Sequence, residues 1–114
     1  MKEGDIVLTP LPQSDGKLKL RPALILRSMP PFNDYLVCGI SSQLHQQVDN
    51  FDEIINQNND DFGSSGLLQS SLIRLGFLAV LPAKNVVGNI GRISTARHNR
   101  LLKNLSDHLL KSIV

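Results

Sequence analysis

The 114-residue chain is poor in cysteine and in aromatic residues, with one cysteine, no tryptophan, four phenylalanines and one tyrosine. A single thiol excludes an internal disulfide. Cys38 lies in the apolar run Tyr35–Cys38, which favours a buried small hydrophobe over a nucleophile. The three histidines are far apart in the sequence and lack the spacing of metal ligands, so a structural zinc site is not expected.

Sequence motifs of cofactor chemistry are also missing. The chain has no P-loop, no dinucleotide-binding glycine pattern and no Gly-x-Ser-x-Gly elbow. Five acidic residues fall between positions 49 and 61, but their spacing matches no calcium loop, which favours a solvated loop. The sequence therefore predicts no bound metal and no cofactor.

Long hydrophobic runs are absent as well. The first residues, Met1–Asp5, contain no apolar signal core, and no apolar run approaches the length of a membrane span. The length suits one domain, residues 1–114, large enough to bury a working core. We expect a cytoplasmic protein without a membrane partner.

Charge is present in modest excess but is unevenly distributed. The net charge is +2, with basic residues concentrated at positions 17–27 and 92–111 and the acidic stretch between them. Such asymmetry suits a face that binds a polyanion beside a loop that repels it. An ordinary solvated surface would give the same pattern, so charge alone leaves both interpretations open.

Short apolar runs separated by turn residues predict five to seven mostly antiparallel strands. The first, Ile6–Thr9, is expected to stop at Pro10 and Pro12, because proline cannot donate to a sheet ladder. Asp15-Gly16 is typical of a hairpin turn. The other expected strands are 18–27, 35–41, 51–55, 67–81 and 86–93, and residues 56–66 are expected to form a mobile polar loop.

The C-terminal segment predicts one helix capped by Ser94. Leucines and an isoleucine recur there at helical spacing and predict a core-facing stripe: Leu101, Leu102, Leu105, Leu109, Leu110 and Ile113. Short strands followed by one packed helix favour a mainly β protein, a small curled barrel with a terminal helix.

Three segments in order resemble the MazF/PemK (Kid-like) family of type II toxins. They are Gly4–Val7, Arg21–Leu26 with its Arg-Pro pair before an aliphatic strand, and Gly39–Gln43. Further along, Gly88–Ser94 is similar to the segment that leads into the family's last helix. The order, spacing and total length together carry the resemblance, which is poorest from 46 to 66.

The resemblance implies a small SH3-like barrel that works as a homodimer. It implies a toxin that cleaves single-stranded RNA without metal and is blocked by a cognate antitoxin. The CcdB-type gyrase poisons share the same fold, so fold alone does not fix activity. A non-catalytic module that binds nucleic acid or gyrase therefore stays open, as does a protein that only binds a partner.

Carried over residue by residue, the resemblance gives Arg21 and Ser41 catalytic roles. Arg21 matches the family's arginine before proline, and a guanidinium suits the negative charge of a phosphate transition state. Ser41 stands where the family has threonine. Without the resemblance, Arg21 would be assigned to a salt bridge on a barrel rim and Ser41 to an ordinary strand end.

Six further residues are expected to bind the substrate: Lys17, Lys19, Ser42, Gln43, Ser71 and Arg74. Many family members carry an acidic residue or glutamine and an arginine on a late strand. Alignment back from Ile90–Ser94 places Gly76–Ala79 there instead, so Ser71 and Arg74, just upstream, are the candidates. No general base or acid is evident on that strand.

Overall fold

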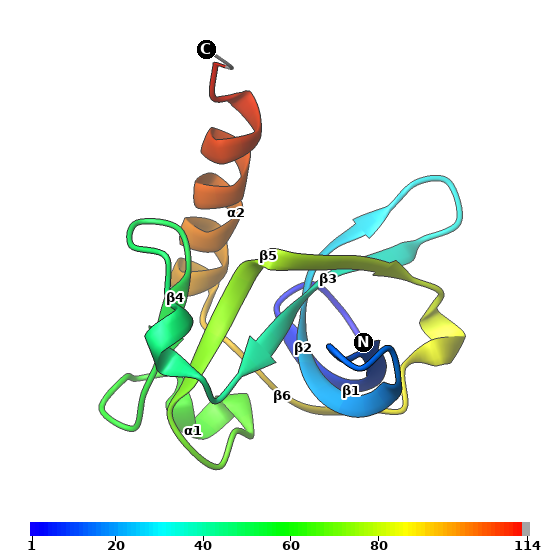
Figure 1. The fold of residues 1–114 in the computed structure, drawn as a ribbon, viewed down its shortest axis with the longest axis horizontal. Helices are drawn as coiled ribbons and strands as arrows, with labels where there is room; N and C mark the ends of the chain where they lie inside the picture. The colour runs from blue at the N-terminus through cyan, green and yellow to red at the C-terminus, as the bar shows by residue number, and fades with distance from the viewer. Residues whose placement is uncertain (113–114) are drawn as a thin grey trace.

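The computed structural model describes residues 1–112, which form a curled six-stranded antiparallel sheet with a long C-terminal helix (Figure 1). The elements are β1 (Asp5–Pro12), β2 (Leu18–Met29), β3 (Asp34–Ser41), β4 (Glu53–Ile55), α1 (Phe62–Ser65), β5 (Ser71–Leu81), β6 (Gly88–Arg92) and α2 (Thr95–Leu110). The strand order is β4-β5-β3-β2-β1-β6. This architecture confirms the predicted fold class. No helix within residues 1–112 is long and apolar enough to cross a membrane.

The first strand runs further than predicted and includes both prolines. Gln13 N donates to Lys17 O, and bonded positions alternate along the ladder, so the nitrogens of Pro10 and Pro12 face away from β2. On that side β6 pairs with β1 only from Asp5 to Leu8. The prolines therefore occupy an edge where no donor is needed.

Strand β2 is buried on both faces between Ala23 and Leu26. Leu24 and Leu26 pack in one cluster with residues of α2, whereas Ala23 and Ile25 pack in a second cluster. All four side chains are fully buried. Alternate residues point to opposite faces of a strand, so this continuous apolar run fits a strand that lies inside the molecule.

Strand β5 contains a bulge where it pairs with β3. Cys38 pairs with Leu78, but the next residue of β3, Gly39, pairs with Arg74. Residues 75–77 therefore bulge out of the ladder. The buried Asp52 receives the N–H of Leu75 at 2.9 Å and so satisfies a donor within the bulge.

The C-terminal helix is capped as predicted, since Ser94 Oγ accepts from Arg97 N at 3.1 Å. Leu101 and Leu105 are buried in the core. The predicted stripe is wrong beyond them, because Leu109 and Leu110 are 70% and 81% exposed. Figure 1 shows why: the last turns of α2 extend past the sheet, where no strand covers them. Ile113, the last member of the stripe, lies outside the described residues.

The acidic stretch is only in part the solvated loop that was predicted, since Asp49 and Asp60 are exposed but other members are buried. Asp52 and Asp61 are each only 6% exposed, and α1 forms within the segment predicted to be a loop. Asp61 holds the guanidinium of Arg97 with contacts of 2.8 and 3.2 Å. The sequence pattern missed this arrangement because β5 and β6 lie between the two charges in the sequence, so the charges meet only after folding.

Candidate functional site

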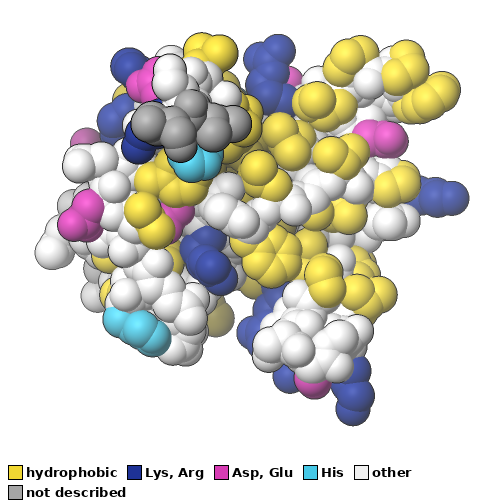
Figure 2. Space-filling model, turned by 45° about the horizontal axis from the view of Figure 1, so that its top comes forward, with side chains coloured by type: hydrophobic (Ala, Val, Ile, Leu, Met, Phe, Trp, Pro, Cys, Tyr) yellow, Lys and Arg dark blue, Asp and Glu magenta, His cyan; other side chains and the backbone are white. Residues whose placement is uncertain are grey.

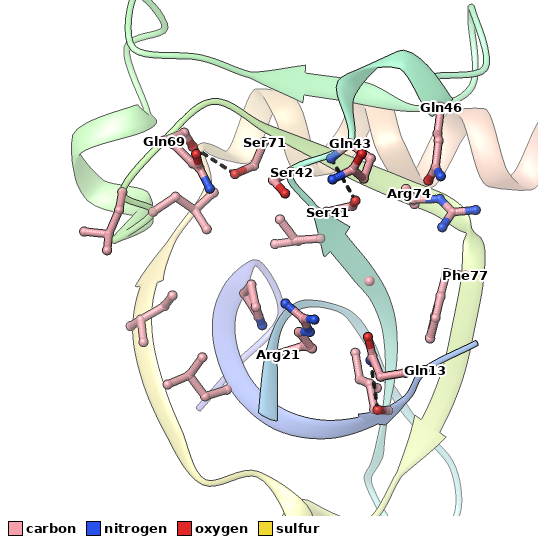
Figure 3. A pocket seen from close by; sticks show the side chains of 18 of the residues that line it. Gln13, Arg21, Ser41, Ser42, Gln43, Gln46, Gln69, Ser71, Arg74 and Phe77 are labelled. Atoms are coloured by element: carbon pink, nitrogen blue, oxygen red, sulfur yellow. Dashed lines mark hydrogen bonds between the residues drawn. The ribbon is translucent and has the colours of Figure 1, made fainter. Parts of the chain in front are cut away.

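A cleft of about 760 Å³ lies between the β1–β2 hairpin, the end of β3 and the segment that leads into β5 (Figure 3). Its polar lining is Gln13, Ser14, Arg21, Ser41, Ser42, Gln43, Gln46, Gln69, Ser71 and Arg74. Apolar side chains, Phe77 among them, complete the wall. Six of the eight predicted site residues therefore meet in one cavity, and Lys17 and Lys19 do not line it.

Arg21 lies on β2 directly opposite Thr9 of β1 and is exposed. Pro22, which follows it, keeps its backbone extended. No acidic side chain or hydrogen-bond acceptor among residues 1–112 engages its guanidinium, so the structural salt bridge on a rim is not found. Figure 3 shows the Arg21 side chain within the cleft. Its donors are available to a ligand with paired acceptor oxygens.

Ser41 ends β3, and its Oγ accepts a hydrogen bond from Gln43 N at 3.0 Å. This bond fixes the oxygen and leaves the hydroxyl hydrogen available to donate. Ser42 and Gln43 are exposed in the turn that follows. A polar rim is thus formed where the strand gives way to a 3-10 turn, Leu44–Gln46.

Arg74 and Ser71 reach the cleft from β5. Arg74 is half-buried opposite Gly39, and its guanidinium has no partner within residues 1–112. Ser71 is 6% exposed and donates its hydroxyl hydrogen to Gln69 O at 2.8 Å. Arg74 is therefore free to contact a ligand, whereas the hydroxyl of Ser71 holds the loop that forms one wall.

Sequence reasoning missed Phe77 as a cleft residue. Arg74 and Phe77 are three positions apart, which places side chains on opposite faces of a regular strand. The bulge at 75–77 shifts the alternation of side chains between the two faces of the strand, so both side chains line the cleft. Gln13, Gln46 and Gln69 were also missed, because isolated glutamines in loops and strand ends carry no distinguishing pattern.

The electrostatics of the cleft are positive but sparse. Its lining contains two arginines and no lysine, histidine, aspartate or glutamate. The predicted polyanion face on the C-terminal segment is weakened, because Arg97 bonds to Glu53 at 2.9 Å and to Asp61, and Arg100 bonds to Glu53 at 3.0 Å. Glu53 and Asp61 of the acidic stretch therefore neutralise these two cations.

Two titratable groups outside the cleft, Cys38 and Asp61, have shifted pKa values. Burial raises the pKa of the Cys38 thiol well above its ordinary value, and the nearby Asp52 charge raises it further. Burial also acts to raise the pKa of Asp61, but hydrogen bonds from Arg97 and Ser94 outweigh it and hold the pKa below the usual range. Cys38 is thus a buried thiol, as predicted. In residues 1–112, no three His, Cys, Asp or Glu side chains are grouped so that they could hold a metal ion.

Comparison with known proteins gives a match to a protein family and similarity to solved structures. The family described as "PemK-like, MazF-like toxin of type II toxin-antitoxin system" matches residues 2–109. Among solved structures, the Mycobacterium tuberculosis toxin MazF-mt6 is similar, with a TM-score of 0.69 and 18% identity over 96% of this chain and 99% of that chain. No individually curated protein sequence matches.

Proposed function

The chain belongs to the PemK-like, MazF-like toxin family of type II toxin–antitoxin systems, and we propose that it is a metal-independent endoribonuclease of the cytoplasm. In this proposal it cuts single-stranded RNA and thereby stops translation and growth. The observation that carries the proposal is the cleft in which Arg21, Ser41 and Arg74 converge. Neither of the two arginines is engaged in an ion pair within residues 1–112.

The proposed reaction uses the RNA's own 2′-hydroxyl as the nucleophile. The 2′ oxygen forms a bond to the adjacent phosphorus, and the bond from phosphorus to the 5′ oxygen breaks. The nucleophile loses a proton and the leaving oxygen gains one, which gives a 2′,3′-cyclic phosphate and a free 5′-hydroxyl. Negative charge builds on the phosphate oxygens in the transition state. The paired N–H donors of Arg21 would bind that charge.

Ser41 and Arg74 would hold the same phosphate from other sides. The Ser41 oxygen is fixed by Gln43 N, so its hydroxyl hydrogen can point to a phosphate oxygen. Arg74 is a permanent cation beside it, since a guanidinium does not deprotonate in proteins. Ser42 and Gln43 on the rim would contact the chain of nucleotides next to the cut. Lys17 and Lys19, which lie outside the cleft, would contact the RNA backbone only beyond the hairpin.

A second candidate is a module on the same fold that binds nucleic acid without cutting it. It is favoured by one observation: the cleft lining holds no histidine, carboxylate, lysine, tyrosine or cysteine that could transfer the protons of the reaction. Catalysis by this cleft would have to rely on charge stabilisation and on positioning, with water carrying the protons.

Two protein partners belong to the proposal. A type II toxin pairs with an antitoxin, and a cognate antitoxin is the expected inhibitor. A second copy of this chain is the other expected partner. Leu78, Val80, Leu109 and Leu110 are all between 41% and 81% exposed. Figure 2 shows hydrophobic side chains gathered on one face of the molecule. Burial of such a face in a homodimer would remove it from water.

The test compares wild type, Arg21→Ala and Arg27→Ala on a long single-stranded RNA in EDTA. Arg27 lies on the same strand and is exposed, but it is outside the cleft. We expect discrete cuts by wild type and by Arg27→Ala, and a loss of roughly 10²–10³-fold in rate for Arg21→Ala. The new 5′-hydroxyl ends should accept phosphate from a polynucleotide kinase directly. RNA that is bound but never cut would refute the nuclease and support the binding module.

A further inference from the structure

Phe77 is the only aromatic residue among the side chains that line the cleft. The other aromatic residues, Phe32, Tyr35, Phe51 and Phe62, lie elsewhere. Phe77 is half-buried against the core cluster that contains Ala23 and Ile25, and the exposed part of its side chain lines a cleft with two unpaired arginines. We propose that Phe77 is a stacking platform for one unpaired nucleobase of the RNA. This subsite rests on the proposed function, because it presupposes that the cleft takes single-stranded RNA.

The ring of Phe77 is held in place by β3. A Cβ built on Gly39 would lie 3.2 Å from Phe77 Cγ, so the ring packs directly on the Gly39 backbone. Any side chain at position 39 would push it away. Phe77 also packs against the core cluster that contains Ala23 and Ile25, and the part of the side chain that stays exposed lines the cleft. Such a platform is ordered before a base arrives, which lowers the entropic cost of stacking.

The bulge in β5 is what brings this ring beside the cations. Arg74 pairs with Gly39 in the ladder, and Phe77 packs on the same glycine, so the bulge brings both residues of β5 to one position of β3. Asp52 stabilises the bulge through the N–H of Leu75 at 2.9 Å. A buried hydrogen bond therefore holds the bulge in place, and Figure 3 shows Arg74 and Phe77 side by side along β5.

The distance to the proposed cut site suits a single nucleotide. Gly39 and Ser41 are two residues apart on β3 and share one face, which separates their backbones by about 7 Å. That is within the span of one nucleotide from its phosphate to its base. A phosphate held at Ser41 and Arg21 would therefore place an adjoining base over Phe77. Stacking would accept any base but require it to be unpaired, which selects single-stranded RNA.

The chain has no tryptophan, so a single introduced indole reports on one place. Phe77→Trp puts that probe in the cleft, and Phe32→Trp puts it in the β2–β3 turn, where Phe32 is 82% exposed and outside the cleft. The ligand is single-stranded RNA of mixed sequence with 2′-O-methyl groups throughout, which binds but cannot be cut. We expect this RNA to quench the emission of Phe77→Trp and to leave that of Phe32→Trp unchanged.

Affinity gives the second readout. Phe77→Leu keeps an apolar side chain but removes the ring, and we expect it to bind the same RNA roughly ten- to a hundredfold more weakly than wild type. Phe77→Tyr should bind like wild type, as should Phe32→Leu. Thermal unfolding checks that Phe77→Leu is folded. If it is not folded, the emission of Phe77→Trp still tests the stacking subsite.

Two outcomes would overturn the stacking subsite. One is RNA bound with equal affinity by wild type and Phe77→Leu while the emission of Phe77→Trp stays constant. The other is no binding of RNA at all. Because the ligand cannot be cut, these results are independent of the cleavage assay. Quenching of Phe77→Trp by this RNA, together with a wild type that cuts no natural RNA, would support the subsite and refute the nuclease.

Discussion

Neutralising Asp61 should destabilise the protein more than any other single change of charge in the acidic stretch. In Asp61→Asn the volume is kept, but the buried guanidinium of Arg97 loses the partner that holds it at 2.8 and 3.2 Å. Breaking a buried pair in this way costs about 3–5 kcal/mol. Arg97 keeps Glu53 at 2.9 Å and Ile54 O at 3.2 Å, so we expect the lower end, about 3 kcal/mol.

Urea and thermal unfolding followed by circular dichroism measure this loss. About 3 kcal/mol should lower the melting temperature of a domain of this size by roughly 10–15 °C. The matched control is Asp60→Asn, because Asp60 is the exposed neighbour of Asp61 and should change stability by less than about 0.5 kcal/mol. Equal effects of the two substitutions would refute the ion pair as a determinant of stability.

The pH dependence follows from the direction of the shift. The folded-state pKa of Asp61 is lowered, because the bonds from Arg97 and Ser94 outweigh the effect of burial. A lowered pKa contributes stability that is fully present above the unfolded pKa of about 3.9 and is lost as pH falls through the folded value. The difference in unfolding free energy between wild type and Asp61→Asn should thus be constant from neutral pH down to about pH 5 and shrink below about pH 4. A difference that shrank already above pH 5 would contradict this.

Three further predictions concern packing, assembly and electrostatics. Gly91→Ala should destabilise the protein by about 1–3 kcal/mol in urea, since its Cβ would clash with the Ser64 carbonyl, whereas Gly76→Ala, with open space around it, should be milder. Val80→Lys should convert the proposed homodimer to a folded monomer in sedimentation experiments, and an unchanged mass would argue against this interface. A plot of the logarithm of the affinity for uncleavable RNA against the logarithm of the salt concentration should have a slope of about −1.4 for two arginine–phosphate contacts. A slope steeper than about −3 would mean that other cations take part.

The parts of the fold that the sequence predicted are those with local causes. Hairpin chemistry at Asp15-Gly16, the Ser94 cap and the apolar run Ala23–Leu26 each act within a few residues, and each was found as expected. The prolines of β1 misled the prediction because their effect depends on whether a neighbouring strand lies on the side of the missing N–H. That is a property of the sheet and not of the segment.

The candidate site shows the same limit. The Arg-Pro pair and the end of β3 could be identified because they stand in short motifs, and they meet in the cleft with Arg74. Phe77 could not be identified, because strand periodicity places it on the opposite face from Arg74 and only the bulge reverses that. The internal pairs of Arg97 with Glu53 and Asp61 were equally hidden, since charge counted along the chain does not show which charges meet.

These internal pairs bear on how the cleft would choose its RNA. The arginines at the start of α2 form ion pairs with Glu53 and Asp61. Arg21 and Arg74 are the only cations that line the cleft. Two phosphate contacts supply little sequence-independent affinity. Because phosphate contacts position a nucleic acid and base contacts specify it, most discrimination would have to come from the uncharged lining. A ring at Phe77 and amides such as those of Gln13 and Gln69 suit that task, so we expect the proposed nuclease to cut at few sites and to depend on an unpaired base at each of them.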